Sequence, residues 1–249
     1  MNYNDFEEKD MTRWDSASSS YNRNGELALS AAFPALMRKV YVWMTLALTI
    51  TAITAYGVAT SPALMGMIYG SRFAFFGLII AELVLVIWLS ARIQKLSLTT
   101  ATLMFIVYSI VNGATLASIF AFYSMSVIGQ TFAVTAGTFG VMAVYGYFTK
   151  KDLTSWGRLL FMALIGLIIA GIVNMFLRNS MMDLVVSGIG VLVFVGLTAY
   201  DSQKIKQMLL MQEDASEGAQ KVALMGALSL YLDFINLFLY LLRFMGRER

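Results

Sequence analysis

Seven continuous apolar runs dominate the chain from residue 40 onward. Each is long enough to cross a bilayer as one helix, for which about 20 apolar residues suffice. Their apolar residues follow one another instead of alternating with a period of two, which favours helices over the strands of a membrane barrel. The runs are Val40–Thr60, Phe73–Ile93, Leu98–Phe122, Ser126–Tyr147, Leu159–Leu177, Leu184–Ile205 and Val222–Leu242. The pattern predicts an all-α, polytopic membrane protein with a seven-transmembrane-helix bundle.

Composition supports a membrane protein and excludes several kinds of chemistry. The chain has 249 residues, of which 59% are apolar and 13% are charged, whereas a soluble domain carries about 25% charged residues. Its net charge of +3 is too small to indicate a nucleic-acid partner. Without Cys or His there is no disulfide, no thiol nucleophile and no histidine proton switch. A pH response near neutrality would depend on carboxylates, lysines or tyrosines, and we expect no bound cofactor.

The first thirty residues differ from the rest, because they are polar and lack an apolar core. They do not have the pattern of a signal peptide. We expect residues 1–30 to form a disordered polar tail and residues 31–249 to form the transmembrane domain.

Basic residues are distributed unequally between the two sides of the seven runs. If the runs alternate in direction, ten lie on the side of the N-terminal tail: Arg38, Lys39, Arg92, Lys95, Lys150, Lys151, Arg158, Lys204, Lys206 and Lys221. Five lie on the other side: Arg72, Arg178, Arg243, Arg247 and Arg249. The positive-inside rule therefore places the N-terminus in the cytoplasm. The three C-terminal arginines fit this less well, and a re-entrant run that leaves both ends cytoplasmic is the alternative.

The last run carries an aspartate, Asp233, at its middle. A charge at this depth is costly unless it is paired, protonated or in contact with water, so it is a functional candidate. Ser229, four residues before it, and Asn236 and Tyr240, three and seven residues after it, lie at helical spacing and form one polar stripe with it. Lipid offers such a stripe no hydrogen-bond partners, so we expect it to face protein or water.

Two more carboxylates lie within runs: Glu82 in the second and Asp201 near the end of the sixth. An ion pair with Lys204 or Lys206 is an alternative for Asp201. Arg92 closes the second run, where it could extend to the membrane surface or reach a carboxylate. Asp201 and Asp233 reach the same depth only if one of their helices extends beyond its apolar run, so spacing alone leaves their pairing open.

Small residues recur at four-residue spacing in the fourth and fifth runs, as in Ala133/Gly137, Ala136/Gly140 and Gly166/Ala170. Such patterns let helices approach closely in lipid. We expect them to serve packing within the chain; a dimer interface is the alternative.

Two segments resemble the Bax inhibitor (transmembrane Bax inhibitor motif, TMBIM) family, and its bacterial members especially. They are GLTAYDSQKIK (Gly196–Lys206) and ALSLYLDFINLFLYLLRFMG (Ala227–Gly246), supported by YGYFTKKDLTSWG (Tyr145–Gly157) and by the seven runs. The resemblance covers all but about the first thirty residues. It implies a bundle with a central last helix, in the bacterial cytoplasmic (inner) membrane.

The resemblance also implies a pH-sensitive calcium leak controlled by two aspartates, which fall here on Asp201 and Asp233. Some bacterial members have an arginine late in the second helix that contacts the sixth-helix aspartate; Arg92 and Lys95 lie nearby, but the run aligns only with a shift. Glu82 matches a second-helix glutamate of the family better. Asn236, Glu82 and Arg92 are therefore candidates for supporting roles.

A mechanism follows as a hypothesis. Two adjacent carboxylates in a low dielectric do not both ionise easily, so they share a proton and titrate as a coupled pair. Calcium prefers six to eight oxygen ligands. Asp201, Asp233 and Asn236 with water, and Glu82 as a further candidate, would hold it weakly, as a permeant or regulatory ion. Protons, calcium and membrane lipid are the expected partners.

Two other functions fit parts of the sequence. An intramembrane aspartyl protease would also use two aspartates on neighbouring helices, but this chain has Leu232-Asp233 where that class has Gly-Asp. We therefore expect no enzyme. An interaction protein that regulates a membrane-bound quality-control protease, or stress and cell-death machinery, would instead depend on the loops or the tail.

Overall fold

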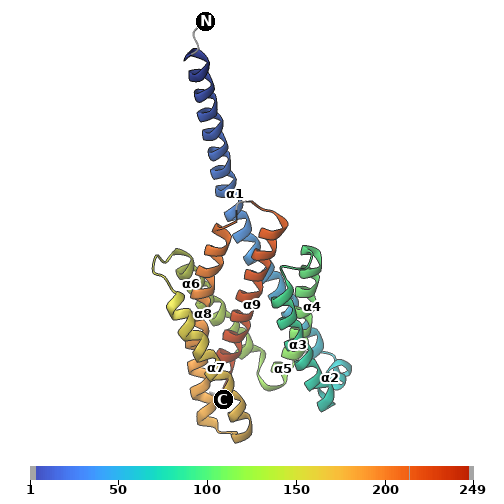
Figure 1. Cartoon of the computed structure of the whole chain (residues 1–249). Helices are drawn as coiled ribbons and strands as arrows, with labels where there is room; N and C mark the ends of the chain where they lie inside the picture. Colours follow the sequence, from blue (N-terminus) through green and yellow to red (C-terminus); the bar gives the residue numbers. More distant parts are fainter. Residues whose placement is uncertain (1–3, 213, 247–249) are drawn as a thin grey trace.

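The computed structural model describes residues 4–212 and 214–246, with side chains described from residue 32 onward. This part of the chain forms helices and no strand. The helices are α1 (Asn4–Ala59), α2 (Pro62–Tyr69), α3 (Arg72–Arg92), α4 (Leu98–Leu116), α5 (Ile119–Phe122), α6 (Met125–Phe148), α7 (Thr154–Leu177), α8 (Ser180–Leu210) and α9 (Glu217–Met245). They pack as one bundle (Figure 1).

Seven helical segments are long and apolar enough to cross a membrane, which confirms the all-α, seven-helix prediction. The third of these spans, Leu98–Phe122, consists of α4 and the short α5. The first span begins at Ala32 within α1. The first span begins at one end of the bundle, and α9 finishes at the other end (Figure 1). This arrangement agrees with seven crossings rather than with a re-entrant run.

The backbone of α1 is helical from Asn4, and its first part projects beyond the bundle (Figure 1). Its side chains before Ala32 lie outside the described residues. Our expectation of a disordered tail over residues 1–30 therefore stays a prediction.

Side-chain caps explain where several helices begin. A serine or asparagine directly before the helix accepts a hydrogen bond from a backbone N–H of the first turn, which would otherwise lack a partner. Asn179 caps α8 in this way through Met181 N and Met182 N, at 2.9 and 3.0 Å. Ser216 caps α9 through Ala219 N at 3.4 Å.

Helix α9 is the centre of the bundle. It packs against α8, α1, α6 and α4, and 67% of its span is buried, against 6% for the spans of α3 and α7. This arrangement gives α9 two buried faces, one toward α6 and α8 and the other toward α1 and α4.

Close helix packing depends on different glycines from those expected. A Cβ added at Gly137, Gly140 or Gly166 would meet no other atom within 4 Å, so the prediction that these positions serve packing within the chain is wrong. Instead, Gly146 of α6 lies directly on α8, where an added Cβ would be 2.1 Å from the carbonyl oxygen of Ala199. The four-residue spacing identified small residues but not the face of the helix that contacts a neighbour.

Candidate functional site

The polar stripe of α9 faces a cavity between α7, α8 and α9. The cavity has a volume of about 810 Å³, and all four stripe residues line it: Ser229, Asp233, Asn236 and Tyr240. The remaining lining is largely apolar, with Phe161 of α7 and Leu197 of α8 among it. The stripe therefore lies on the side of α9 that faces this cavity.

Two close contacts fix the register of α8 against α9. Ile205 packs on Gly226, where an added Cβ would lie 2.9 Å from Ile205 Cγ2. Fifteen residues earlier on α8, Gly190 packs against the ring of Tyr240, and an added Cβ would be 2.4 Å from that ring. The helices are antiparallel, so Asp201 lies level with about residue 230 of α9. Asp233 is about three residues further along, or ~5 Å at 1.5 Å per residue.

The extension of both helices beyond their apolar runs makes this register possible. Helix α8 continues to Leu210 and α9 begins at Glu217, whereas the runs end at Ile205 and begin at Val222. The sequence could not decide whether Asp201 and Asp233 share a depth, because the ends of the two helices contain polar residues.

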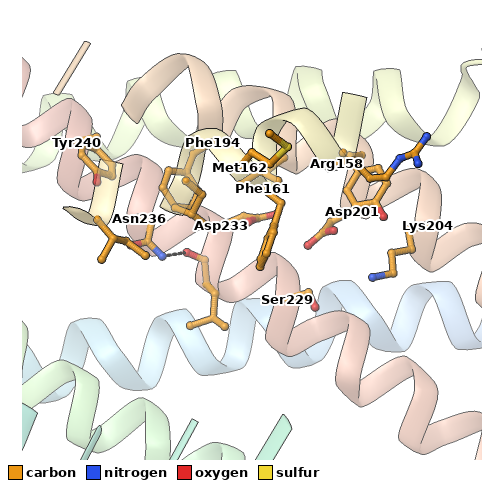
Figure 2. A pocket seen from close by; sticks show the side chains of 16 residues that line it. Arg158, Phe161, Met162, Phe194, Asp201, Lys204, Ser229, Asp233, Asn236 and Tyr240 are labelled. Atoms are coloured by element: carbon orange, nitrogen blue, oxygen red, sulfur yellow. Dashed lines mark hydrogen bonds between the residues drawn. The ribbon is translucent and has the colours of Figure 1, made fainter. Parts of the chain in front are cut away.

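Asp201 and Asp233 line the same cavity, and their carboxyl groups interact electrostatically. Figure 2 shows both side chains between Lys204 and Arg158 at one end and Tyr240 at the other. Asp233 is 6% exposed. Its Oδ2 atom is buried and accepts no hydrogen bond from the described part of the chain. A buried carboxylate oxygen without a donor is costly, so this atom is suited to share a proton or to bind a cation.

The neutral side chains with oxygen atoms that line the cavity are Tyr200, Ser229, Asn236 and Tyr240. Asn236 Nδ2 donates to Leu232 O at 2.8 Å (Figure 2), so the amide oxygen is the atom that this side chain could offer to a cation. The described residues contain no group of three or more acidic side chains placed to hold a metal ion. Calcium usually has six to eight oxygen ligands, so the cavity suits transient contact with a largely hydrated ion rather than a tight site.

Lys204 and Lys206, the two candidates for an ion pair with Asp201, have different surroundings. Lys204 lines the cavity and interacts electrostatically with Asp201, while its Nζ lies 5.8 Å from the centre of the Tyr200 ring. Lys206 points elsewhere, because its Nζ donates to Tyr147 O at 2.7 Å. Neither lysine is within 4 Å of a carboxylate oxygen of Asp201.

The structure does not bring Glu82 or Arg92 to the aspartate pair. Helix α3, which carries both, packs against α4 and α2 and lies on the other side of α9 from α7 (Figure 1). Arg92 is exposed and forms no ion pair with Asp201. Glu82 Oε1 instead accepts a hydrogen bond from Asn112 Nδ2 of α4.

Glu82 ends a chain of hydrogen bonds on the opposite face of α9. Tyr231 OH donates to Asn112 Oδ1 at 2.9 Å and lies 2.7 Å from Thr51 Oγ1 of α1. Thr51 Oγ1 also lies 3.0 Å from Ser109 O. This chain joins α1, α3, α4 and α9. Sequence reasoning identified Glu82 but missed Tyr231, because a tyrosine in an apolar run resembles ordinary core filler.

Arg158 is a further lining residue that the sequence did not single out. It lies near the start of α7, one residue after Gly157, whose backbone packs so closely on the Tyr200 ring that an added Cβ would be 2.4 Å from it. The contact of Gly157 with Tyr200 brings Arg158 to the same end of the cavity as Lys204 (Figure 2).

Comparison with known proteins supports the resemblance noted in the sequence. Residues 34–249 match the family model described as "Inhibitor of apoptosis-promoting Bax1". The chain is 50% identical over 221 residues to the inner membrane protein YbhL of Escherichia coli strain K12, covering 88% of this chain and 94% of YbhL. It is also 45% identical over 213 residues to a protein of Borreliella burgdorferi, covering 86% of this chain and 92% of that protein.

Proposed function

The chain belongs to the Bax inhibitor family of membrane proteins, and from this premise we propose that it is a pH-sensitive calcium leak channel. In this proposal Asp201 and Asp233 form the coupled pair that gates the leak. The protein acts in the bacterial cytoplasmic (inner) membrane, as the name of its relative YbhL suggests, with its N-terminus in the cytoplasm, as the distribution of basic residues suggests.

The observation that carries the proposal is the unpartnered Oδ2 atom of Asp233 beside the carboxyl group of Asp201. If both groups were ionised, two negative charges would face each other in a low dielectric, and one oxygen would have no donor. A proton shared by the pair removes one charge and supplies a donor. A cation between the groups compensates both charges. The pair therefore exchanges a proton for a cation as pH changes.

Calcium suits this exchange because it binds carboxylate and amide oxygens and accepts irregular geometry. The pair and Asn236 supply only part of a full ligand set, so water provides the rest and the ion is held weakly. Weak binding is what permeation requires, since the ion must enter the site and also leave it.

On the side away from Lys204, the lining of the cavity reaches the Tyr240 ring. This ring packs on the backbone of Gly190 and stacks on Phe194 with ring centres 5.6 Å apart. A continuous path therefore requires α8 and α9 to shift relative to each other. The aspartate pair joins these two helices, so its protonation state biases that shift.

The test is calcium entry into liposomes that contain the purified protein, measured with a trapped calcium indicator at several pH values. The proposal predicts protein-dependent entry that varies with pH and that changes in Asp233→Asn. Serine at position 216, outside the cavity, provides the matched control variant Ser216→Asn, which keeps a side-chain cap at α9. Entry that is independent of the protein, or a pH response that Asp233→Asn leaves unchanged, would refute the proposal.

A further inference from the structure

The cavity between α7, α8 and α9 is open toward the outer surface of the bundle. Phe161, Met162 and Ile168 line it and are 58%, 67% and 53% exposed. All three lie on α7, a segment long and apolar enough to cross the membrane. At this depth the surroundings of an exposed apolar side chain are lipid. We call this open cavity the α7–α9 groove.

Two cations stand at one end of the groove. Arg158 and Lys204 both line it, and both are exposed. Among the described residues, neither has a carboxylate oxygen within 4 Å of its charged nitrogens. Trp156, which is 62% exposed, precedes Arg158 on α7. Tryptophan is enriched where the hydrocarbon meets the head groups, so the cations lie at head-group level.

The length of the groove matches one lipid chain. Along α8 it runs from Lys204 to Phe194, which is ~15 Å for ten residues at 1.5 Å per residue. One leaflet of a hydrocarbon core of ~30 Å is also ~15 Å thick. The lining between the two ends includes Leu197, Leu232 and Leu164, so its chemistry suits an acyl chain.

From the paired cations and the apolar length below them, we propose that the α7–α9 groove binds an anionic phospholipid. Its phosphate lies between Arg158 and Lys204, and one acyl chain lies along α8 toward Phe194. Such a chain passes Asp233, so the lipid and a hydrated calcium ion exclude each other from the groove. This last consequence rests on the proposed function, whereas the binding site itself does not.

Native mass spectrometry of the detergent-solubilised full chain, with phosphatidylglycerol or phosphatidylcholine added, tests the site. We expect wild-type protein to retain phosphatidylglycerol in preference to phosphatidylcholine. The variant Arg158→Gln/Lys204→Gln should lose ~10-fold or more in phosphatidylglycerol affinity, since each cation near a membrane surface adds roughly fivefold to the attraction of anionic lipid. The matched control, Lys150→Gln/Lys151→Gln, removes two cations from the same side that do not line the groove, and should retain the lipid.

A second pair of variants tests the acyl-chain part of the groove. Met162→Trp fills it, while Ile169→Trp places the same side chain on α7 outside it, at a residue that is 58% exposed. Only Met162→Trp should lower lipid retention. Equal retention of the two lipids by the wild type, or equal loss in a variant and its control, overturns the proposal. A dimer without bound lipid would also overturn it, because a second copy would then occupy the groove. None of these readouts involves calcium flux, so failure of the leak assay leaves the result interpretable.

Discussion

Ile205 of α8 packs directly on the backbone of Gly226 of α9, at a distance that leaves no room for a Cβ atom. This contact sets the register that brings Asp201 and Asp233 to one cavity. The position of the aspartate pair therefore depends on Gly226, which lies seven residues before Asp233 and does not itself line the cavity.

Replacing Gly226 with valine should force α8 and α9 apart. Overpacking a close contact typically costs about 1–3 kcal/mol, so we expect a lower midpoint of thermal unfolding in detergent. Gly137→Val is the matched control, because a side chain there meets no atom within 4 Å. If both variants unfold at the same temperature, the close contact does not contribute to stability.

Tyr231→Phe should destabilise the protein without touching the cavity. It removes the hydroxyl that donates to Asn112 Oδ1 and contacts Thr51 Oγ1. Interhelical hydrogen bonds in membrane proteins contribute roughly 0.6 kcal/mol on average, with a maximum of about 1.7. We expect a loss in this range in the free energy of unfolding, measured by denaturant titration in mixed micelles.

The control for Tyr231→Phe is Tyr56→Phe, which removes a hydroxyl from a tyrosine of α1 that is 53% exposed. It should leave the free energy of unfolding unchanged. An equal loss of free energy of unfolding in both variants would contradict this. The loss would then come from removing any tyrosine hydroxyl, and not from breaking the chain of hydrogen bonds that joins four helices.

Glu82→Gln should leave the pH dependence of calcium entry as it is in the wild type. Glu82 contacts Asn112, on the face of α9 opposite the aspartate pair, and a glutamine oxygen can accept the same hydrogen bond. Glu82→Leu removes the acceptor and should lower the midpoint of thermal unfolding. A Glu82→Gln variant without a pH response in the liposome assay would place this glutamate in the gating mechanism, contrary to the proposed role of the aspartate pair.

The sequence was sufficient to predict the number and type of the spanning helices, because seven long apolar runs have few alternatives in a bilayer. It also predicted that Ser229, Asp233, Asn236 and Tyr240 share a face, since helical periodicity fixes this. Helix ends were less predictable. The cap of α9 at Ser216 and the extension of α8 to Leu210 lie in polar segments that hydropathy assigns to loops.

Contacts between helices were the least predictable from sequence. The meeting of Asp201 with Asp233 depends on the contact of Ile205 with Gly226, and Glu82 lies on α3, across α9 from the pair. Nothing local to Glu82 distinguishes a partner on α4 from a partner on α8. The small residues Gly137 and Gly166 illustrate the same point, because spacing alone cannot tell an inward face from an outward one.

The central claim is that Asp201 and Asp233 act as one titrating pair, and the pH profile of calcium entry into liposomes tests it most directly. The profile is measured for Asp201→Asn, Asp233→Asn and the double variant. We predict that each single substitution abolishes the wild-type pH response and that the double variant behaves like either single one. Each single variant retaining part of the response, with effects that add in the double variant, would contradict the claim.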